Sequence, residues 1–236
     1  MKAFLLAAGV GSRLRPLTDR MPKCLVPVNG EPLLGLWFRL LARHGFTELL
    51  LNTHHLPEQV RAFVAAWRGS DVRVTLFHEP VLLGSAGTVA ANRAFVAGES
   101  SFLVVYADNL TDLDLTEFHA YHTAKQSPFT LGLFESPEPT QCGIASLDAN
   151  GRVTAFVEKP KSPQGNLANA GLYLAGPSLF DLIPDKLYAD FGFDILPQLI
   201  GRMYGYRIPG YYCDLGTPER LESGQRDWAL RPRHSL

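Results

Sequence analysis

The sequence predicts a doubly wound α/β fold, with a mostly parallel mixed sheet and a smaller α+β portion. Two observations support this prediction. Short apolar runs alternate with segments of helical periodicity over the first half of the chain, as in successive β-α units. The second half changes to closely spaced strand-like runs, which indicates that the later strands include antiparallel ones.

In the first half, each expected strand is a short apolar run, and each expected helix carries apolar residues at helical spacing. The expected strands cover residues 2–7, 47–52, 72–77 and 101–106. The first expected helix begins after Pro32 and is ended by the glycine at position 45. The other expected helices of this half cover residues 57–67, 85–95 and 113–125.

In the second half, strand-like runs come first and helical periodicity returns towards the end. The expected strands are 129–134, 143–147, 153–158 and 171–175, with an Asn-Gly turn in 148–151. The expected helices are 178–182, 193–203 and 218–228. We therefore expect one domain over residues 1–228, divided near residue 126, and a polar tail at 229–236.

Composition excludes several classes of protein. The chain has 236 residues, of which 46% are hydrophobic and 19% charged, so it is expected to fold without disulfides or structural metals. Lysine and arginine number 22 against 23 acidic residues, which argues against a general nucleic-acid-binding surface. The three cysteines, Cys24, Cys142 and Cys213, form no C-x-x-C pair, which is typical of reduced thiols in the cytoplasm.

No membrane-spanning segment is expected, because no apolar run approaches the ~20 residues that such a helix needs. The apolar stretch at the N-terminus is short for a signal peptide and runs directly into a polar loop. We therefore expect it to be a buried first strand. The sequence does not determine an oligomeric state.

A glycine loop follows this first strand. Gly9 and Gly11 allow backbone N–H groups to approach an anion, and Arg13 and Arg15 add positive charge beside them. The loop differs from the dinucleotide-binding fingerprint, because Leu14 stands where that motif has its third glycine, and it lacks the Gly-Lys-Ser/Thr of a P-loop. These residues favour a triphosphate-binding loop, with an ordinary tight turn as the alternative.

Lys23 lies between Pro22 and Pro27, which restrict the backbone and give the lysine a defined direction. Taken alone, such a lysine is more often a solvated surface residue. Asp108 follows the strand at 101–106 and Asp214 follows a Tyr-Tyr-Cys run, so two hard oxygen ligands stand at strand ends. For Asp108 the alternative is a turn cap.

Together, residues 6–18 and 22–28 resemble the signature of the sugar-1-phosphate nucleotidylyltransferases (NDP-sugar pyrophosphorylases), and the overall likeness is to short mannose-1-phosphate guanylyltransferase-like chains. Segments 83–88, 158–160, 169–171 and 214–218 also resemble motifs of this family. The resemblance implies a Rossmann-like, GT-A-like nucleotidyltransferase fold. It also implies a nucleotide-binding half at 1–126 and a sugar-phosphate-binding half at 127–228.

The resemblance implies roles for residues in four groups. The nucleotide-binding residues are Leu6, Ala7, Ala8, Gly9, Gly11, Ser12, Arg13, Gly84, Ser85, Gly87 and Thr88. The sugar-phosphate-binding residues are Asn109, Gly143, Glu158, Lys159, Asn169 and Gly171. The catalytic residues are Arg13, Lys23 and Asp108, and the ligands of a catalytic Mg²⁺ are Asp108 and Asp214.

The implied reaction joins a nucleoside triphosphate to a sugar 1-phosphate and releases pyrophosphate. GTP with mannose 1-phosphate is the favoured pair. The alternatives are dTTP or UTP with glucose 1-phosphate, and a MurNAc or heptose 1-phosphate. The chain departs from the commonest family pattern at Ala107, Cys142 and Tyr211-Tyr212, none of which removes a charged group.

Two rival functions remain open at this point. Asp112 and Asp114 form a D-x-D, the pattern by which many glycosyltransferases hold a metal, but a helix N-cap is the preferred explanation because so short a pattern is frequent by chance. The other rival is a catalytically silent family member that binds a nucleotide-sugar and regulates a partner. We expect the adjacent His54 and His55 to be a loop or core feature rather than a metal site.

Overall fold

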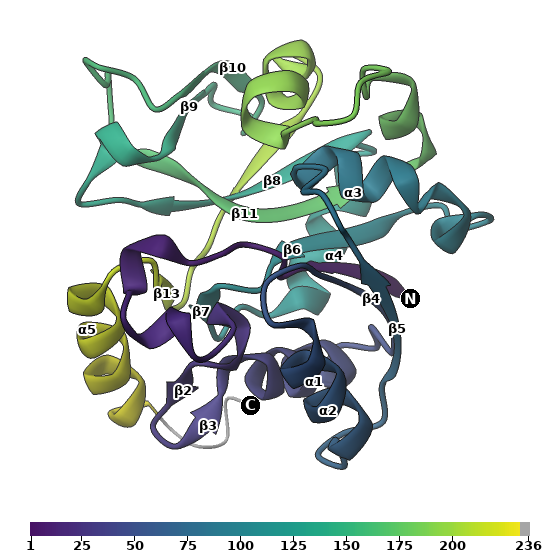
Figure 1. Ribbon diagram of the computed structural model, residues 1–236. Helices are drawn as coiled ribbons and strands as arrows, with labels where there is room; N and C mark the ends of the chain where they lie inside the picture. The colour runs from purple at the N-terminus through teal and green to yellow at the C-terminus, as the bar shows by residue number, and fades with distance from the viewer. Residues whose placement is uncertain (232–236) are drawn as a thin grey trace. The chain divides into compact units, whose positions relative to one another are not determined.

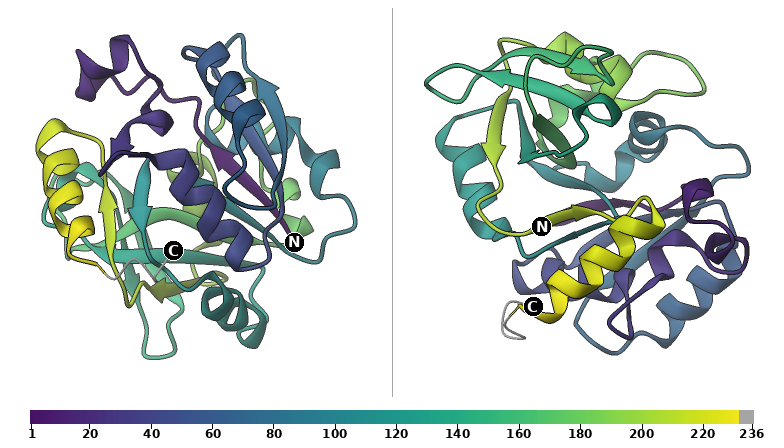
Figure 2. Two further views of the ribbon diagram at one scale, coloured as in Figure 1. Left: turned by 90° about the horizontal axis from the view of Figure 1, so that it is seen from below. Right: turned by 90° about the vertical axis from the view of Figure 1, so that its left-hand side faces the viewer.

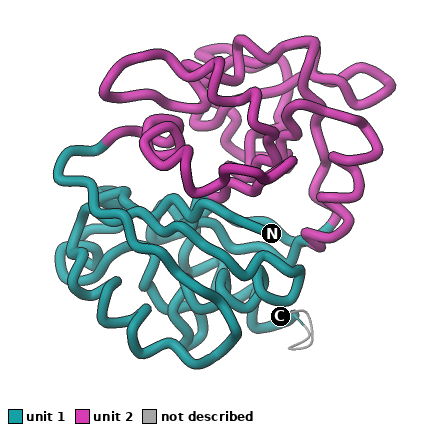
Figure 3. Tube along the Cα trace, turned by 90° about the vertical axis from the view of Figure 1, so that its right-hand side faces the viewer, with its two compact units in different colours: residues 1–82, 106–113, 210–236 teal, residues 83–105, 114–209 magenta. Residues whose placement is uncertain are grey.

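The computed structural model describes residues 1–231, which form two compact units (Figure 3). Unit 1 comprises residues 1–82, residues 106–113 and the chain from residue 210 onward. Unit 2 comprises residues 83–105 and 114–209. The last five positions of the expected polar tail lie outside the described residues. Each unit is therefore assembled from segments that are distant in the sequence.

Unit 1 contains a parallel sheet whose strands are apolar. Its strands are β1 (Lys2–Leu6), β4 (Glu48–Thr53) and β5 (Arg73–His78). β4 lies between the other two, with Leu49 opposite both Ala3 and Val74. The side chains of β1 and β4 are mostly buried, which explains their nearly continuous apolar sequences.

Two helices cover one face of this sheet (Figure 1). They are α1 (Leu33–Arg43) and α2 (Pro57–Ala66). The rings of Phe38, Phe63 and Trp67 pack together between them, with centroids 5.4–6.1 Å apart. α1 ends where Gly45 adopts a φ of 78°, a left-handed conformation that glycine reaches without strain. This is the helix end that the sequence predicts.

Two short antiparallel ribbons complete unit 1. One pairs β2 (Pro27–Val28) with β3 (Glu31–Pro32). The other pairs β7 (Asn109–Thr111) with β13 (Tyr212–Asp214). The C-terminal helix α5 (Pro218–Ala229) packs against β13 and β2 (Figure 2). The second ribbon was not expected from the sequence. Of the two aspartates of the predicted metal site, Asp214 ends β13 and Asp108 immediately precedes β7.

Unit 2 is built around the long strand β11. Its strands are β6 (Phe102–Tyr106), β8 (Phe129–Glu135), β9 (Gly143–Leu147), β10 (Val153–Glu158), β11 (Leu167–Ala175) and β12 (Tyr204–Arg207). β11 pairs antiparallel with β6, β8 and β9, and β9 pairs antiparallel with β10. β12 runs parallel to β8. Later antiparallel strands are therefore confirmed, beside the parallel strands of unit 1.

The helices of unit 2 are α3 (Ser85–Ala91) and α4 (Leu115–Ala124). α3 is shorter than the expected helix because the chain leaves helical geometry at Asn92, whose side-chain amide donates to the Thr88 carbonyl. The helix expected over 193–203 is wrong. The structure has a single π-type turn, Phe191–Ile195, and then a 3-10 turn, Leu196–Leu199, because Pro197 cannot continue a regular helix.

The remaining regular elements are short 3-10 turns. They are Ser12–Leu14, Leu17–Asp19, Lys23–Leu25, Arg93–Val96, Pro139–Gln141 and Pro177–Asp181. Within residues 1–231, no helix is both long enough and apolar enough to cross a membrane. The mixed sheets with flanking helices confirm the predicted doubly wound α/β class.

Candidate functional site

The glycine loop leaves β1 and folds back on itself within unit 1. Gly11 has a φ of 67°, and a Cβ added there would lie 3.0 Å from a methyl of Thr18 and 3.2 Å from Cβ of Lys23. The Thr18 hydroxyl donates to the Gly11 carbonyl at 2.8 Å. Thr18 of the motif therefore holds the loop closed, and glycine at position 11 lets the loop approach Lys23.

The loop presents unused backbone donors. Among the residues that the structure describes, none of the amide N–H groups at positions 9–13 donates a hydrogen bond to the protein. Groups of this kind need a partner, which is water or a ligand. Successive free amides next to arginine form an anion-binding concavity, so this geometry supports the predicted phosphate-binding loop.

The start of the loop is held by a side chain that the sequence analysis missed. The Asn52 carbonyl oxygen, at the end of β4, accepts from the Ala7 amide at 2.6 Å. The Asn52 amide nitrogen donates to the buried Glu79 carboxylate at 2.8 Å. A polar residue at the end of an otherwise apolar strand was the available signal.

Lys23 is not a solvated surface lysine. Only 9% of its side chain is exposed, and its ammonium lies 2.6 Å from an oxygen of Asp108 and 3.7 Å from an oxygen of Asp214. The 3-10 turn Lys23–Leu25, preceded by Pro22, directs this side chain inward. The structure therefore brings one cation and two carboxylates together from three distant parts of the sequence.

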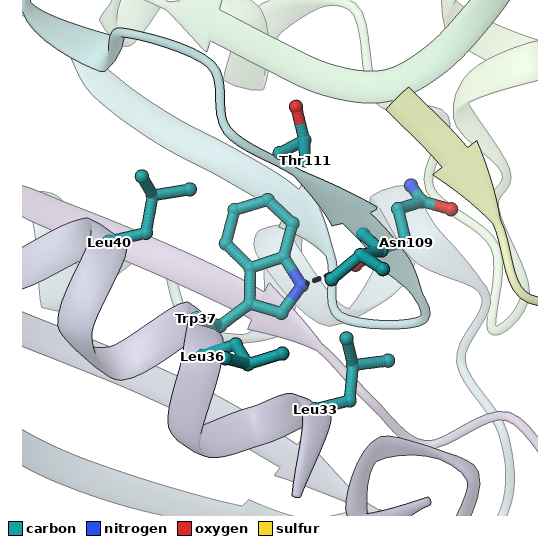
Figure 4. A pocket seen from close by; sticks show the side chains of 7 residues that line it. Leu33, Leu36, Trp37, Leu40, Asn109 and Thr111 are labelled. Carbon is teal, nitrogen blue, oxygen red and sulfur yellow. Dashed lines mark hydrogen bonds between the residues drawn. The ribbon is translucent and has the colours of Figure 1, made fainter. Parts of the chain in front are cut away.

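The ribbon of β7 and β13 explains how the two aspartates meet. Asp214 pairs with Asn109, and the Leu215 amide donates to the Asp108 carbonyl at 3.3 Å, so the two carboxylates stand on neighbouring strands. The Trp37 indole N–H donates to the Asn109 carbonyl at 2.9 Å beside a small apolar pocket (Figure 4). This contact anchors β7 to α1.

Charge interactions link the members of this cluster. Burial and then the charge of Asp108 raise the pKa of Asp214, while Lys23, Arg13 and Arg220 oppose that rise. A Cβ added at Gly216 would lie 2.8 Å from the Arg13 guanidinium and 2.9 Å from an Asp214 oxygen, which places Arg13 at the same point. The sequence analysis missed Arg220, which stands in the first turn of α5. We call Arg13, Lys23, Asp108 and Asp214 the charged cluster.

The D-x-D is explained by hydrogen bonds within the protein. Asp114 caps α4 and accepts from the amides of Thr116 and Glu117 at 2.8 and 2.9 Å, as its N-cap alternative predicts. Asp112 accepts from the Tyr211 amide at 2.6 Å and pairs with Arg231. Both carboxylates stabilise the fold, so the D-x-D does not favour a glycosyltransferase.

The neighbouring histidines also serve the fold. A ring nitrogen of His54 lies 2.7 Å from the Glu79 carbonyl, and one of His55 lies 2.7 Å from the Thr18 carbonyl. Each contact ties a loop of unit 1 to a neighbouring segment. The expectation of a loop or core role is confirmed.

In unit 2, the loop that was expected to bind the base is in contact with residues 186–194. A Cβ at Gly84 would lie 2.4 Å from the Ala189 carbonyl oxygen, and this same oxygen accepts from the amides of Ala86 and Gly87 at 2.9 and 3.0 Å. The Ser85 hydroxyl donates to Asp190 at 2.9 Å. Close packing within the chain therefore requires glycine at position 84, whatever the loop binds.

Glu158 lies at the end of β10, and its carboxylate is close to Gly143 and Gly192. A Cβ at either glycine would come within 2.4 Å of the same Glu158 oxygen. Burial raises the pKa of Glu158, Lys159 opposes the rise, and Asp190 adds to it. Lys159 itself is exposed and has a φ of 48°, which is unusual for a residue with a side chain and marks a fixed backbone conformation beside Pro160.

The last two predicted sugar-phosphate-binding residues form a bulge in β11. Its pairing with β8 shifts between Asn169 and Tyr173, and Gly171 supplies a φ of 66° there. The Asn169 side chain accepts from the Gly171 amide at 2.9 Å and donates to the Tyr173 hydroxyl at 2.8 Å. Asn169 therefore has a structural role independent of any ligand.

The predicted site residues thus form two sets. Unit 1 holds the glycine loop (Leu6, Ala7, Ala8, Gly9, Gly11, Ser12, Arg13), Lys23, Asp108, Asn109 and Asp214. Unit 2 holds Gly84, Ser85, Gly87, Thr88, Gly143, Glu158, Lys159, Asn169 and Gly171. Asn109 belongs to unit 1, whereas the other predicted sugar-phosphate-binding residues belong to unit 2, because Asn109 lies on β7 beside the charged cluster.

Comparison with known proteins gives relatives over nearly the whole chain. Mannose-1-phosphate guanylyltransferase 1 of Arabidopsis thaliana is 31% identical over 232 residues, covering 96% of this chain and 64% of the relative. UTP–glucose-1-phosphate uridylyltransferase of Synechocystis is 31% identical over 233 residues, covering 92% of this chain and 60% of the relative. The chain therefore spans less than two thirds of the length of these relatives.

A solved structure of UDP-glucose pyrophosphorylase complexed with UDP-glucose superposes with a TM-score of 0.83, covering 97% of this chain and 98% of that one at 18% identity. This similarity shows a common fold. The sequence model of the family described as nucleotidyl transferase matches residues 2–229. Because the match covers both units and all the predicted site residues, the chain belongs to the nucleotidyl transferase family.

Proposed function

We propose that this protein transfers a nucleotidyl group from a nucleoside triphosphate to a sugar 1-phosphate. An oxygen of the sugar phosphate attacks the α-phosphorus, the bond from that phosphorus to the bridging oxygen breaks, and pyrophosphate leaves with the electron pair. The products are a nucleoside-diphosphate sugar and pyrophosphate. The observation that carries the proposal is the charged cluster beside a loop whose amides at positions 9–13 donate to no protein group within residues 1–231.

Both substrates are polyanions, so positioning and charge neutralisation are the main tasks of such a catalyst. We assign the β- and γ-phosphates to Arg13 and the loop amides, and the α-phosphate to Lys23, where negative charge increases during the reaction. The attacking phosphate is already ionised at neutral pH. The mechanism therefore needs no side-chain nucleophile.

The donor set fits Mg²⁺. Asp108 and Asp214 offer two carboxylates within reach of one ammonium, and both side chains are about one-third exposed. Residues 1–231 contain no cluster of three or more His, Cys, Asp or Glu suited to a metal, and Mg²⁺ is usually held by one or two carboxylates plus substrate phosphates. When bound, the ion would neutralise phosphate charge and orient the triphosphate. The Lys23 ammonium lies within 4 Å of an oxygen of each carboxylate.

For the sugar phosphate we propose Lys159 as the cationic partner, and Glu158 and Asn169 as partners of sugar hydroxyls. Gly143 and Gly171 would allow close approach of the backbone, and Asn109 would act from β7. The loop formed by Gly84, Ser85, Gly87 and Thr88 would receive the base. The division into a nucleotide-binding half at 1–126 and a sugar-phosphate-binding half at 127–228 belongs to this proposal.

GTP with mannose 1-phosphate is the favoured substrate pair, because several relatives of this chain are named mannose-1-phosphate guanylyltransferases. UTP or dTTP with glucose 1-phosphate follows, since a uridylyltransferase is similarly related. We place the reaction in the cytoplasm, in keeping with three free cysteines. The near-neutral charge of -1 argues against nucleic acid as a partner.

The test is release of pyrophosphate by the purified protein with Mg²⁺. GTP, UTP, dTTP, ATP and CTP would each be combined with mannose, glucose, MurNAc and heptose 1-phosphates. We expect rapid release with one pair and at least tenfold slower release with the others. No release with any pair, from protein that is folded and binds a triphosphate, would favour a silent regulator instead.

A further inference from the structure

Residues 186–194 connect two parts of unit 2 that the proposed function assigns to different substrates. One part is the loop at 84–88, assigned to the base. The other is Glu158, assigned to the sugar. We call residues 186–194 the connecting segment. It has no ligand-binding role in the proposal above.

On the side of the base loop, the contacts form a dense set of hydrogen bonds. The Ser85 hydroxyl donates to Oδ2 of Asp190 and accepts from the Phe191 amide, each at 2.9 Å. The Ala189 amide donates to the Leu83 carbonyl at 2.9 Å, and the Ala189 carbonyl accepts the two amides at the start of α3. The base loop therefore cannot shift without moving the connecting segment.

On the side of the sugar, the contact is steric. The other carboxylate oxygen of Asp190 accepts from the amides of Gly192 and Phe193 at 2.8 and 3.2 Å, which fixes the π-type turn. A Cβ at Gly192 would lie 2.4 Å from Oε2 of Glu158 and 2.8 Å from its Cδ. The Glu158 carboxylate is therefore packed directly on the turn that Asp190 caps.

Further contacts make the connecting segment a rigid unit. Oδ2 of Asp194 accepts from the Asp190 amide at 2.8 Å, and its other oxygen is 2.7 Å from the Lys186 ammonium. The negative charge of Asp190 also adds to the raised pKa of Glu158, in agreement with the short path between them. A displacement at one end is thus transmitted to the other through covalent bonds and two hydrogen-bonded carboxylates.

We propose that Asp190 is a positioning residue that couples the base loop, through the Ser85 hydrogen bond, to Glu158 through the π-type turn. This inference rests on the proposed function for the identity of the two ligands. Its consequence is that recognition of the nucleotide and recognition of the sugar 1-phosphate depend on each other. Linkage requires the dependence to be reciprocal in binding free energy.

The test uses Ser85→Ala, which removes the hydroxyl from the base loop alone. The triphosphate and sugar 1-phosphate pair that the wild-type protein turns over fastest serves as the probe. We expect the KM of the sugar 1-phosphate to rise roughly tenfold along with that of the triphosphate, a loss of about 1.4 kcal/mol each. The kcat should stay within about threefold, because the lost interaction contributes equally to ground state and transition state.

Four further variants make the test specific. Ser85→Thr keeps the hydroxyl and should restore both KM values to within about threefold. Asp190→Ala should show at least the pattern of Ser85→Ala, and the double variant should be no worse than Asp190→Ala, because Asp190→Ala already removes the acceptor of the shared hydrogen bond. Ser178→Ala removes an exposed hydroxyl of unit 2 and serves as the matched control.

A rise in the triphosphate KM alone, with the sugar 1-phosphate KM unchanged in Ser85→Ala, would overturn the coupling. Multiplying effects in the double variant would overturn Asp190 as its route. Hydrogen exchange gives a readout without turnover: Ser85→Ala should speed exchange where Gly143 pairs with Glu158. Unchanged exchange there overturns the coupling, whereas failure of the wild-type protein to release pyrophosphate overturns only the proposed function.

Discussion

Replacement of Lys23 by alanine tests the charged cluster most directly. The ammonium of Lys23 lies 2.6 Å from Asp108 and 3.7 Å from Asp214, and only 9% of the side chain is exposed. Its position is therefore fixed before substrate arrives. One oriented charge contact that is used in the transition state is typically worth ~2.7–4 kcal/mol, so we expect kcat/KM to fall by a factor of ~100 or more.

The same change also affects stability, and the two effects need to be separated. Loss of the shared cation leaves two carboxylates facing each other, which costs about 3–5 kcal/mol for a fully buried pair and less for an exposed one. Asp108 and Asp214 are 38% and 32% exposed, so we expect the free energy of unfolding to fall by about 1–3 kcal/mol. Thermal unfolding gives this number, and rates are then measured well below the transition.

The assay is pyrophosphate release by the fastest substrate pair at saturating Mg²⁺. Lys125→Ala is the matched control, because that lysine is half-buried outside the charged cluster, and its ammonium donates to the Asn150 carbonyl and contacts tyrosine rings. The control should retain activity within about twofold. A loss of less than threefold in folded Lys23→Ala would refute the role of Lys23 and, with it, the reasoning from the charged cluster.

Three other expectations follow from the structure. Chelation by EDTA should abolish pyrophosphate release and Mg²⁺ should restore it, with Asp214→Asn needing at least tenfold more Mg²⁺ for half-maximal rate; full activity in EDTA would contradict the metal assignment. Asp114→Ala should lower the free energy of unfolding by ~1 kcal/mol through loss of the cap of α4, while kcat/KM stays within about twofold; a tenfold loss of activity would show that Asp114 does more than cap α4. Burial lowers the pKa of His122 from 6.5 to about 4. The folded protein therefore keeps its full stability above pH 6.5, where His122 is neutral in both states, and loses stability as the pH falls towards 4 because the unfolded chain takes up the proton first. Denaturant titrations should show that the free energy of unfolding falls by about 2 kcal/mol between pH 7 and pH 5, and by less in His122→Asn. An equal dependence of the unfolding free energy on pH in the two proteins would show that His122 is not the titrating group.

The fold was largely predictable because its first half consists of strongly periodic segments. Apolar runs and amphipathic stripes placed β1, β4 and α2 within a residue or two of their observed ends. The prediction of a helix over 193–203 was wrong, because the apolar periodicity of this segment continues past Pro197, whereas the proline prevents a regular helix there. The ribbon of β7 and β13 could not be found, because three-residue strands are too short for a period to appear.

The sequence indicated which residues form the candidate site, but it did not indicate the contacts that those residues make. The glycine loop, Lys23 and the two aspartates were identified from motif and spacing. The sequence analysis missed Asn52, Glu79 and Arg220, because their contacts with the glycine loop and with Asp214 join residues that are distant in the sequence or belong to no recognised motif. The sequence also could not show that the loop at 84–88 is held by residues about a hundred positions later.

By itself, the sequence determined the local conformations and the residue types available: helices and strands from the apolar period, a permissive glycine loop at Gly9 and Gly11, and two carboxylates, a lysine and an arginine. These properties depend on interactions among near neighbours in the chain. Only the tertiary structure decided that Lys23 sits against Asp108 across 85 positions, and that Asp112 accepts from the Tyr211 amide across 99 positions. The physical reason is that long-range pairing depends on packing and strand register, which bring distant side chains to one place, and no local pattern encodes that distance.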